Sequence, residues 1–303
     1  MGNISKPTVP ELDAILGQRF PVLHDGFIRV VDYMGTDESI VQAARVSYGS
    51  GTKTTSSDEQ LIRFMIRHGH TSPFEMCEIK LHVRVPMDVW RQWIRHRTAN
   101  VNEYSTRYSE AIDSQHCVDH DEWRLQSSTN RQGSGDTLKT WPMSIERCDL
   151  PTNTPGEFLT DEQAKFHKYA RQVYKDRLNL GVAREQARCD LPLSTFTEAY
   201  WAIDLHNLLH FLFKRLAPDA QYEIRQYANV IAGLVAKWVP HAWRAFQDYK
   251  LNAMTLSATE VEAIRAVLAD GNQPYWNCTP DGMSKGEAEE FRKKLVRLGA
   301  RGV

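Results

Sequence analysis

The sequence predicts a fold of the α+β class, because patterns typical of strands and of long helices occur along the same chain. Residues 77–85 alternate strictly between apolar and polar side chains, as in a strand with one buried face. Residues 160–180 and 218–235 instead carry apolar side chains at helical spacing, over lengths typical of helices. With 303 residues, 42% of them hydrophobic, the chain can bury a substantial core between such elements.

The N-terminal quarter of the chain is expected to supply one strand and two helices. Residues 1–25 are punctuated by proline and are predicted to wrap the surface, while residues 27–33 predict the strand. The first helix is expected to open near Asp37. Ser56 and Glu59 are spaced as a capping box for the second helix, and its buried face is predicted to consist of Leu61, Phe64 and Met65.

The strand of residues 77–85 leads directly into a further helix. Pro86 lies where a first helical residue is favoured, because a backbone N–H has no helical partner at that position. The side chains expected to face a core at helical spacing are Trp90, Trp93 and Ile94. The common flank of the helix, at positions i, i+3 and i+4, is predicted to hold Gln92, Arg95 and His96.

The segment that follows, residues 95–108, holds three arginines, one histidine and a single carboxylate, Glu103, with few side chains that favour burial. Two guanidinium charges about 5 Å apart repel by roughly 3 kcal/mol at an effective dielectric constant of about 20. Such a cluster stabilises a fold poorly, but its planar groups match phosphates and carboxylates. The segment therefore indicates a site for an anionic ligand, with a solvated helix end as the alternative.

Composition argues against several classes of protein. The 37 basic side chains are balanced by 38 acidic ones, whereas a nucleic-acid-binding protein normally has a basic excess, so no nucleic-acid partner is expected. Apolar runs are too short for a membrane span, and no signal-peptide core is apparent, so no membrane partner is expected. The five cysteines include no C-x-x-C pair, which argues against a zinc or redox motif and favours a reducing cytoplasm.

Residues 110–158 are rich in Asp, Ser, Gly, Gln and Thr and are predicted to form a long irregular insertion, partly ordered by Trp123 and Trp141. Thr160 and Gln163 are spaced as the capping box of the long helix that follows.

A later helix, from about residue 203, carries His206 and His210 four residues apart, a spacing that can bind a metal. No third ligand follows nearby, so no metal site is predicted. Residues 256–303 are expected to form a C-terminal helical extension without visible chemistry. Its two helices are each predicted to open with a capping box, formed by Ser257 with Glu260 and by Ser284 with Glu287.

Arg95-His96-Arg97, followed after seven residues by Ser105, resembles the signature of flavin-dependent thymidylate synthases, the ThyX family. Four further blocks resemble that family in the same order: residues 70–75, 102–108, 204–212 and 220–224. The resemblance implies an antiparallel sheet flanked by long helices, with residues 1–255 as the catalytic domain. It also implies a homotetramer whose active sites are shared between subunits.

The activity implied by the resemblance is the reductive methylation of dUMP to dTMP in the cytoplasm. 5,10-methylenetetrahydrofolate would supply the carbon, and FAD reduced by NADPH would supply the hydride. By position, the residues that resemble the substrate-binding ones are Gln92, Arg95, Glu103, Ser105, Thr106, Arg107, Arg188 and Arg215. Those that resemble the flavin contacts are Ser72, Arg95, His96, Arg97, Glu103, Asp204, His206 and His210.

Arg215 resembles the arginine that the family places against the uracil ring, where a fixed cation would polarise the ring without a covalent nucleophile. Ser105 is expected to bind phosphate, because a nucleophilic serine needs a base and the arginines beside His96 should lower the pKa of that histidine. His70 is either a turn residue or a ligand contact, and Tyr108 either packs or stacks on a flat ring.

Two rival functions remain open at this point. One is a flavoprotein that acts on another pyrimidine nucleotide through the same anion-binding segment. The other is a nucleic-acid-binding protein that uses residues 95–107 as its contact patch, which the nearly neutral net charge of −1 disfavours.

Overall fold

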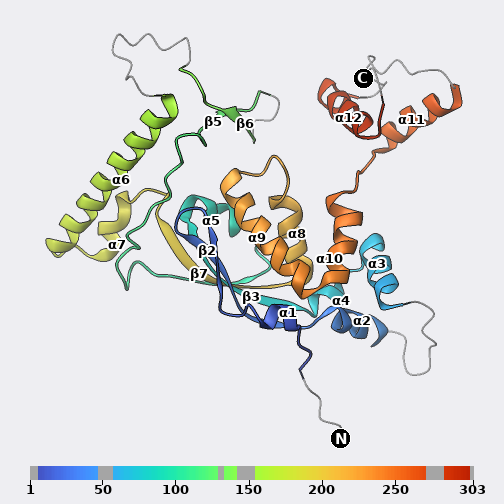
Figure 1. Ribbon diagram of the computed structural model, residues 1–303, viewed down its shortest axis with the longest axis horizontal. Coiled ribbons are helices and arrows are strands. Elements are labelled where there is room, and N and C mark those ends of the chain that lie inside the picture. The colour runs from blue at the N-terminus through green and yellow to red at the C-terminus, as the bar shows by residue number, and fades with distance from the viewer. Residues whose placement is uncertain (1–5, 47–56, 129–132, 142–153, 271–282, 301–303) are drawn as a thin grey trace, which may run out of the picture. The chain divides into compact units, whose positions relative to one another are not determined.

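The computed structural model describes residues 6–46, 57–128, 133–141, 154–270 and 283–300. The chain divides into two compact units, Met1–Phe246 and Gln247–Val303. The first unit contains the sheet and all candidate site residues (Figure 1). In the described part of the chain, no helix combines the length and apolar character needed to cross a bilayer.

The first unit is built on a five-stranded sheet in which every pair of neighbouring strands is antiparallel. The spatial order is β1 (Arg19–Val22), β2 (Gly26–Met34), β3 (Glu78–Pro86), β7 (Phe196–Asp204) and β4 (Asn100–Glu103). The predicted α+β class and antiparallel sheet are therefore confirmed. The strand predicted at residues 77–85 is β3, displaced by one residue.

Three helices pack against the sheet: α5 (Met87–Trp93), α8 (Leu205–Arg215) and α9 (Tyr222–Trp238). Trp93 of α5 lies at the centre of the core between them and is fully buried. Its ring centroid is 5.2 Å from that of Trp201 on β7 and 4.9 Å from that of Phe211 on α8. This aromatic cluster fixes α5 relative to the sheet, and α5 leads into the arginine-rich segment.

The remaining helices flank this core or belong to the second unit. In the first unit they are α1 (Pro10–Asp13), α2 (Asp37–Val46), α3 (Asp58–His68), α4 (Ser72–Glu75), α6 (Pro155–Asn179), α7 (Arg184–Ala187), the 3-10 turn Arg188–Asp190 and α10 (Pro240–Phe246). In the second unit they are the π-helical turn Gln247–Leu251, α11 (Ala258–Asp270) and α12 (Lys285–Arg297). The predicted capping boxes of α11 and α12 both form.

Two predictions for the N-terminal part were wrong. The described part of this segment, residues 6–25, includes α1, strand β1 and the buried side chain of Leu12, so it adds to the core and the sheet instead of only covering the surface. Helix α3 is capped by Ser57 with Gln60, one residue later than predicted, and Ser56 lies outside the described residues. Of the predicted buried face, Met65 is buried, Leu61 is only partly buried and Phe64 is exposed, and the other buried residues of the helix are Ile62 and Ile66.

Two further corrections concern the arginine-rich segment. Helix α5 ends at Trp93, so Ile94 is 43% exposed instead of facing the core, and Arg95 and His96 follow the helix rather than line its flank. Residues 100–103 form edge strand β4, which the polar sequence gave no reason to expect.

Part of the predicted irregular insertion is ordered. It contains the hairpin of β5 (Arg124–Gln126) and β6 (Ser134–Thr137), and it continues into α6, which begins at Pro155 behind a capping box of Thr154 and Glu157. The predicted cap residue Thr160 instead lies inside α6, where its Oγ1 accepts a hydrogen bond of 2.9 Å from Trp123 Nε1. Trp141 packs its ring 5.6 Å from that of Phe158. Both tryptophans of the segment thus contact α6.

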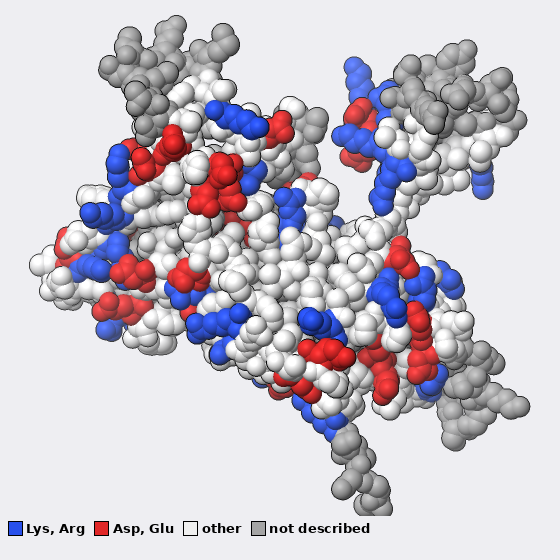
Figure 2. Space-filling model, in the orientation of Figure 1, with Lys and Arg blue, Asp and Glu red and all other residues white. Residues whose placement is uncertain are grey.

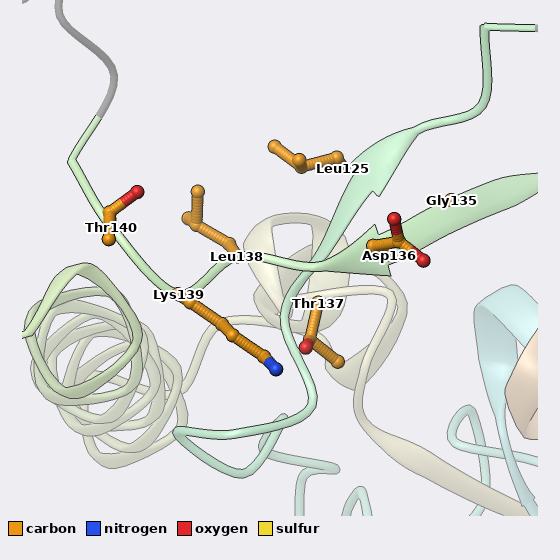
Figure 3. Close-up of a pocket in the computed structure, with 7 residues that line it drawn as sticks. All are labelled: Leu125, Gly135, Asp136, Thr137, Leu138, Lys139 and Thr140. Atoms are coloured by element: carbon orange, nitrogen blue, oxygen red, sulfur yellow. The ribbon is translucent and has the colours of Figure 1, made fainter.

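A hollow of about 780 Å³ lies at this hairpin, lined by Leu125, Gly135, Asp136, Thr137, Leu138, Lys139 and Thr140 (Figure 3). It is formed almost entirely by consecutive residues of one strand and its continuation. Because such a surface lacks walls from other elements, the hollow is a bend in the chain rather than an enclosed ligand site.

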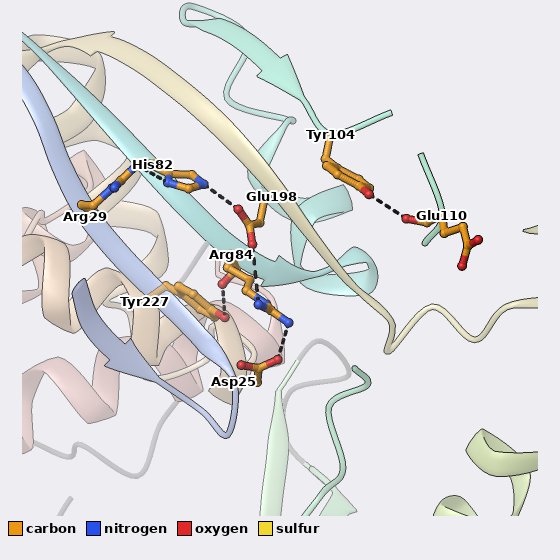
Figure 4. Close-up of polar contacts among 8 residues, drawn as sticks. All are labelled: Asp25, Arg29, His82, Arg84, Tyr104, Glu110, Glu198 and Tyr227. Atoms are coloured by element: carbon orange, nitrogen blue, oxygen red, sulfur yellow. Dashed lines mark hydrogen bonds and ion pairs between the residues drawn. The ribbon is translucent and has the colours of Figure 1, made fainter. Parts of the chain in front are cut away.

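One face of the sheet carries a polar network across three strands (Figure 4). Arg29 on β2 donates a 2.8 Å hydrogen bond to His82 Nδ1, and His82 Nε2 lies 2.8 Å from Glu198 Oε2. Since a guanidinium can only donate, Nε2 of His82 carries the proton and donates to Glu198. Glu198 also contacts Arg84, which pairs with Asp25. These bonds tie β2, β3 and β7 together in one register.

Candidate active site

The clearest convergence of predicted site residues surrounds Arg215, at the end of α8. Its Nε donates a 3.1 Å hydrogen bond to His96 Nε2, and its Nη2 donates a 3.0 Å bond to the backbone carbonyl of Gln92. His210, one helical turn earlier, places its ring 5.8 Å from that of His96. Arginine carries more N–H donors than these two bonds use. The partly buried guanidinium therefore keeps donors for a ligand.

The hydrogen bond from Arg215 fixes the tautomer of His96. Because Nε2 accepts this bond, the ring proton of the neutral imidazole resides on Nδ1. Burial, followed by the charge of Arg215 and then by His210, lowers the pKa of His96 from 6.5 to about 4. His96 is thus a neutral group at physiological pH, which agrees with the predicted lowering of its pKa. A neutral His96 avoids a second positive charge beside Arg215.

This lowered pKa predicts a pH dependence of stability. Below pH 6.5 the unfolded chain protonates His96 but the folded chain does not until about pH 4, so the stability is intact above 6.5 and declines as the pH falls towards 4. The free energy of unfolding lost over this pH range through His96 amounts to at most about 3 kcal/mol, and solvent screening makes it smaller. We expect His96→Gln, which keeps an acceptor for Arg215, to lose less stability between pH 7 and pH 5 in urea titrations.

Other histidines also make the stability fall as the pH is lowered, because burial also lowers the pKa of His82, His116, His167 and His210. The measurement therefore compares the change in unfolding free energy between the two proteins at matched pH. Identical losses in the variant and the parent would contradict the role assigned to His96.

The carboxylate of Glu103 is held from two sides. Trp90 Nε1 on α5 donates to Glu103 Oε2 at 3.0 Å, and Thr197 Oγ1 on β7 donates to Glu103 Oε1 at 2.9 Å. Glu103 ends edge strand β4, opposite Ala199 of β7. These bonds fix the one negative charge of the arginine-rich segment. Trp90 and Thr197 were not among the predicted site residues, since their sequence positions suggest only core packing.

Four predicted substrate-binding residues meet at the loop after β4. Arg188 donates through Nη1 to Thr106 Oγ1, and Arg107 Nε lies 3.3 Å from Glu185 Oε2 on α7. The neighbouring Ser105 accepts a 3.4 Å hydrogen bond from the backbone of Arg107. The loop therefore docks on the α7 region and brings two guanidinium groups and two hydroxyl groups to one place, a donor set that suits a phosphate.

A further pairing was missed by the sequence analysis. The side-chain amide of Gln92 donates to Oε1 of Gln221, the residue before α9. Gln221 lies in one of the sequence blocks that carry the resemblance, so its position could have marked it as a candidate. It holds the side chain of Gln92, as Arg215 holds the Gln92 carbonyl.

In the described structure, the other predicted residues form no side-chain hydrogen bond or ion pair with the residues around Arg215, Glu103 or the loop after β4. Arg95 and Arg97 are exposed and form no ion pair or hydrogen bond with any described residue. The remaining three flavin candidates are Ser72 on α4, Asp204 and His206. Asp204 caps α8, where it accepts from the backbone N–H of Asn207 at 2.9 Å. Among the residues that the structure describes, no group of three His, Cys, Asp or Glu side chains is placed to hold a metal.

The two residues whose roles were left open lie at the surface. His70 is exposed after α3 and packs its ring 5.8 Å from that of Phe64. Tyr108 is 78% exposed, so it does not pack in the core of this chain. Basic and acidic side chains are interspersed over the described surface visible in Figure 2, which shows no broad basic field. A nucleic-acid contact patch is thus disfavoured on this face.

Comparison with known proteins adds to this geometry. The family model described as thymidylate synthase complementing protein, Thy1, matches residues 29–241. The chain belongs to this family. The matched residues of the Thy1 family include all candidate positions, from Ser72 to Arg215.

Similar proteins are known in several bacteria. A flavin-dependent thymidylate synthase of Wolbachia pipientis is 48% identical over 273 residues, which cover 90% of this chain and 92% of that protein. A protein of the same name from Ruegeria pomeroyi is also 48% identical, over 95% of this chain and 91% of its own length. Among solved structures, the UMP/dUMP methylase PolB from Streptomyces cacaoi, bound with 5-Br dUMP, has a TM-score of 0.65 and 27% identity. The matched region covers 77% of this chain and 99% of the PolB chain.

Proposed function

We propose that this protein is a flavin-dependent thymidylate synthase, which methylates dUMP reductively to dTMP with 5,10-methylenetetrahydrofolate as the carbon donor. Family membership and relatives of that name with 48% identity support the proposal. The observation that carries it is the partly buried guanidinium of Arg215, fixed by His96 and by the carbonyl of Gln92. All three residues resemble substrate or flavin positions of the family.

The residues fit FAD as the resident cofactor. Arg95 and Arg97 are exposed guanidinium groups that no other described residue pairs with, and such groups suit a pyrophosphate. Helix α4, which carries Ser72, contacts helix α8, which carries His206 and His210. The predicted flavin residues of these two helices are thus on neighbouring elements. When bound and reduced by NADPH, the flavin supplies the hydride of the reaction.

The protein's own residues would bind and polarise the nucleotide. Arg107 and Arg188 would hold the phosphate, with the Ser105 hydroxyl as an additional donor. Arg215 would place positive charge on the N3/O4 edge of the uracil ring and stabilise the negative charge that develops there. His96 accepts a hydrogen bond from Arg215 and so holds its orientation. No covalent enzyme nucleophile is required by this arrangement.

Replacing Ser105 with alanine is expected to leave measurable turnover. The loss of one hydrogen bond to a charged phosphate should raise KM for dUMP by about 10- to 100-fold, while kcat stays close to that of the parent. Steady-state kinetics with varied dUMP measures both. Ser109→Ala in the same loop is the control, with no expected change. Complete loss of turnover with normal dUMP binding would instead identify Ser105 as a catalytic nucleophile.

The function is tested by two measurements on the purified full-length protein. Its visible absorption spectrum, before and after addition of dUMP, reports whether a flavin is bound and whether the nucleotide reaches it. Incubation with dUMP, methylenetetrahydrofolate and NADPH should then yield dTMP. A protein that takes up no FAD, or a flavoprotein that forms no dTMP, would overturn the proposal.

A second candidate substrate is UMP, because the solved structure that is 27% identical is named a UMP/dUMP methylase. The same assay with UMP in place of dUMP separates the two. Faster methylation of UMP would favour this second activity, whereas a clear preference for dUMP supports the thymidylate synthase.

We further propose a cytoplasmic homotetramer with active sites shared between subunits, in which residues 1–255 are catalytic and residues 256–303 are a helical extension. The exposed positions of Arg95, Arg97 and Tyr108 support shared sites, because a neighbouring subunit or a ligand could cover these side chains. Residues 110–158 would remain an insertion in this catalytic domain.

A further inference from the structure

Helix α9 begins at a residue whose side chain does not cap it. Gln221 occupies the N-cap position, where Ser, Thr, Asp and Asn are favoured because their side chains accept a hydrogen bond from the first turn. The Gln221 side chain makes no such bond. It accepts a hydrogen bond from the side-chain amide of Gln92 on α5, which contacts α9 (Figure 1). A position that gives up a local stabilising bond for a contact across the fold indicates a role beyond folding.

The partners of Gln221 determine which way two amide groups point. Burial raises the pKa of the Asp88 carboxyl, and a hydrogen bond from the Gln221 side chain is among the contacts that lower it. This bond therefore favours the ionised carboxylate, which can only accept. Gln221 donates to Asp88 through Nε2 and keeps its Oε1 for Gln92. Gln92 in turn donates through its own Nε2.

This arrangement leaves a free acceptor on Gln92. Its Oε1 has no hydrogen-bond partner among the described residues, yet the atom is not buried, so a ligand can reach it. The backbone of Gln92 is held as well, because its carbonyl accepts a 3.0 Å bond from Arg215 Nη2. An amide fixed at its backbone and at its nitrogen presents the oxygen in one direction. A nucleotide carries donors for it, namely the ribose hydroxyl groups and the N–H of uracil.

The first turn of α9 is clamped by the insertion of residues 110–158. Tyr222 donates its hydroxyl to Glu122 Oε1 at 2.9 Å, and Arg124 Nη2 lies 3.1 Å from Glu223 Oε1. The guanidinium of Arg124 also lies over the Tyr222 ring, 4.3 Å from its centroid. Because Tyr222 and Glu223 directly follow Gln221, these contacts keep Gln221 in place.

We infer that Gln221 is a positioning residue for substrate binding, which holds the amide of Gln92 so that its Oε1 faces the nucleotide as an acceptor. This inference rests on the proposed function, because Gln92 resembles a substrate-binding residue of the family. Asp88 sets the direction of the Gln221 amide, and Glu122 and Arg124 hold the start of α9. The insertion thereby contributes to substrate binding without contacting the nucleotide through these residues.

The test is a double-mutant cycle in which isothermal titration calorimetry measures the affinity of the flavin-loaded, full-length protein for dUMP. Gln221→Ala and Gln92→Ala should each weaken binding by about tenfold, the effect of losing one hydrogen bond. The double variant should bind no more weakly than Gln92→Ala, because Gln221 acts only through Gln92. Bound FAD, measured by the visible spectrum, should be unchanged. Gln172→Ala, at an exposed position of α6, is the matched control and should bind as the parent does.

An exchange variant separates positioning from folding. Asp88→Asn/Gln221→Glu swaps the amide and the carboxylate between two positions with little change of shape. The carboxylate at position 221 then accepts from Gln92, and the amide at position 88 donates to that carboxylate. We expect dUMP affinity close to that of the parent. A folded exchange variant that binds as weakly as Gln221→Ala would contradict the inference.

The outcomes distinguish this inference from the proposed function. A parent that binds dUMP, with unchanged affinity in Gln221→Ala, would overturn the inference alone. The same follows if the double variant loses about 100-fold, the product of the two single losses, because independent roles give that result. Absence of saturable dUMP binding by the parent would overturn the proposed function and the inference with it.

Discussion

Replacing Arg215 with alanine is expected to reduce kcat for thymidylate formation by at least about 10²–10³-fold, the typical cost of losing one preorganised charged donor. The guanidinium is positioned before substrate arrives, by a 3.1 Å bond to His96 and a 3.0 Å bond to the Gln92 carbonyl. The charge of Arg215 is held in a partly buried environment, and this burial lowers the pKa of the guanidinium. Charge stabilisation is stronger there than in water.

Flavin binding should be largely unchanged in Arg215→Ala, because Arg215 is assigned to the uracil ring alone. The visible spectrum of the purified variant measures bound FAD, and a single-turnover assay measures chemistry. Arg215→Lys retains the charge but loses the planar fork, so we expect an intermediate rate. Arg265→Ala removes an exposed arginine of α11 and should leave the rate unchanged. Loss of bound flavin in Arg215→Ala would show that the role assignment is wrong.

The sequence was most informative where a strict period or an ordered block of polar residues was present. The unbroken alternation of residues 77–85 placed β3 within one residue, because each slip of one residue would expose the apolar face.

The placement of α6 was less certain for a physical reason. Thr154 with Glu157 and Thr160 with Gln163 have the same capping spacing, and periodicity alone does not choose between them. In the structure the helix extends to the earlier box.

Side-chain partnerships across the fold were the least predictable part of the candidate site. Glu103 is bonded to Trp90 and Thr197, and Gln92 to Gln221, over separations of 13, 94 and 129 residues. Such contacts depend on how the sheet and helices pack, which no local pattern encodes. Edge strand β4 is a similar case, since its four residues are all exposed and lack the alternation that marks a half-buried strand. Its position is set by pairing with β7.

The second large effect is expected from Trp93→Ala, which should lower the free energy of unfolding by about 3–5 kcal/mol. The indole is fully buried and contacts rings on four elements, with centroid distances of 5.9 Å to Trp90, 5.2 Å to Trp201, 4.9 Å to Phe211 and 5.7 Å to Tyr227. Its Nε1 has no hydrogen-bond partner in the described structure, so the loss is one of packing rather than of a hydrogen bond.

The same substitution separates packing from chemistry at the candidate site. Trp93 is adjacent to Gln92, whose carbonyl anchors Arg215, so a cavity at position 93 should also loosen the guanidinium and lower kcat. Trp93→Phe retains a ring against Phe211 and should lose less of both stability and rate. Urea titration followed by far-ultraviolet circular dichroism measures the free energy of unfolding, and the dTMP assay measures kcat. A loss of less than about 1 kcal/mol in Trp93→Ala would contradict the central position of this side chain, because full burial makes so small a cost exceptional.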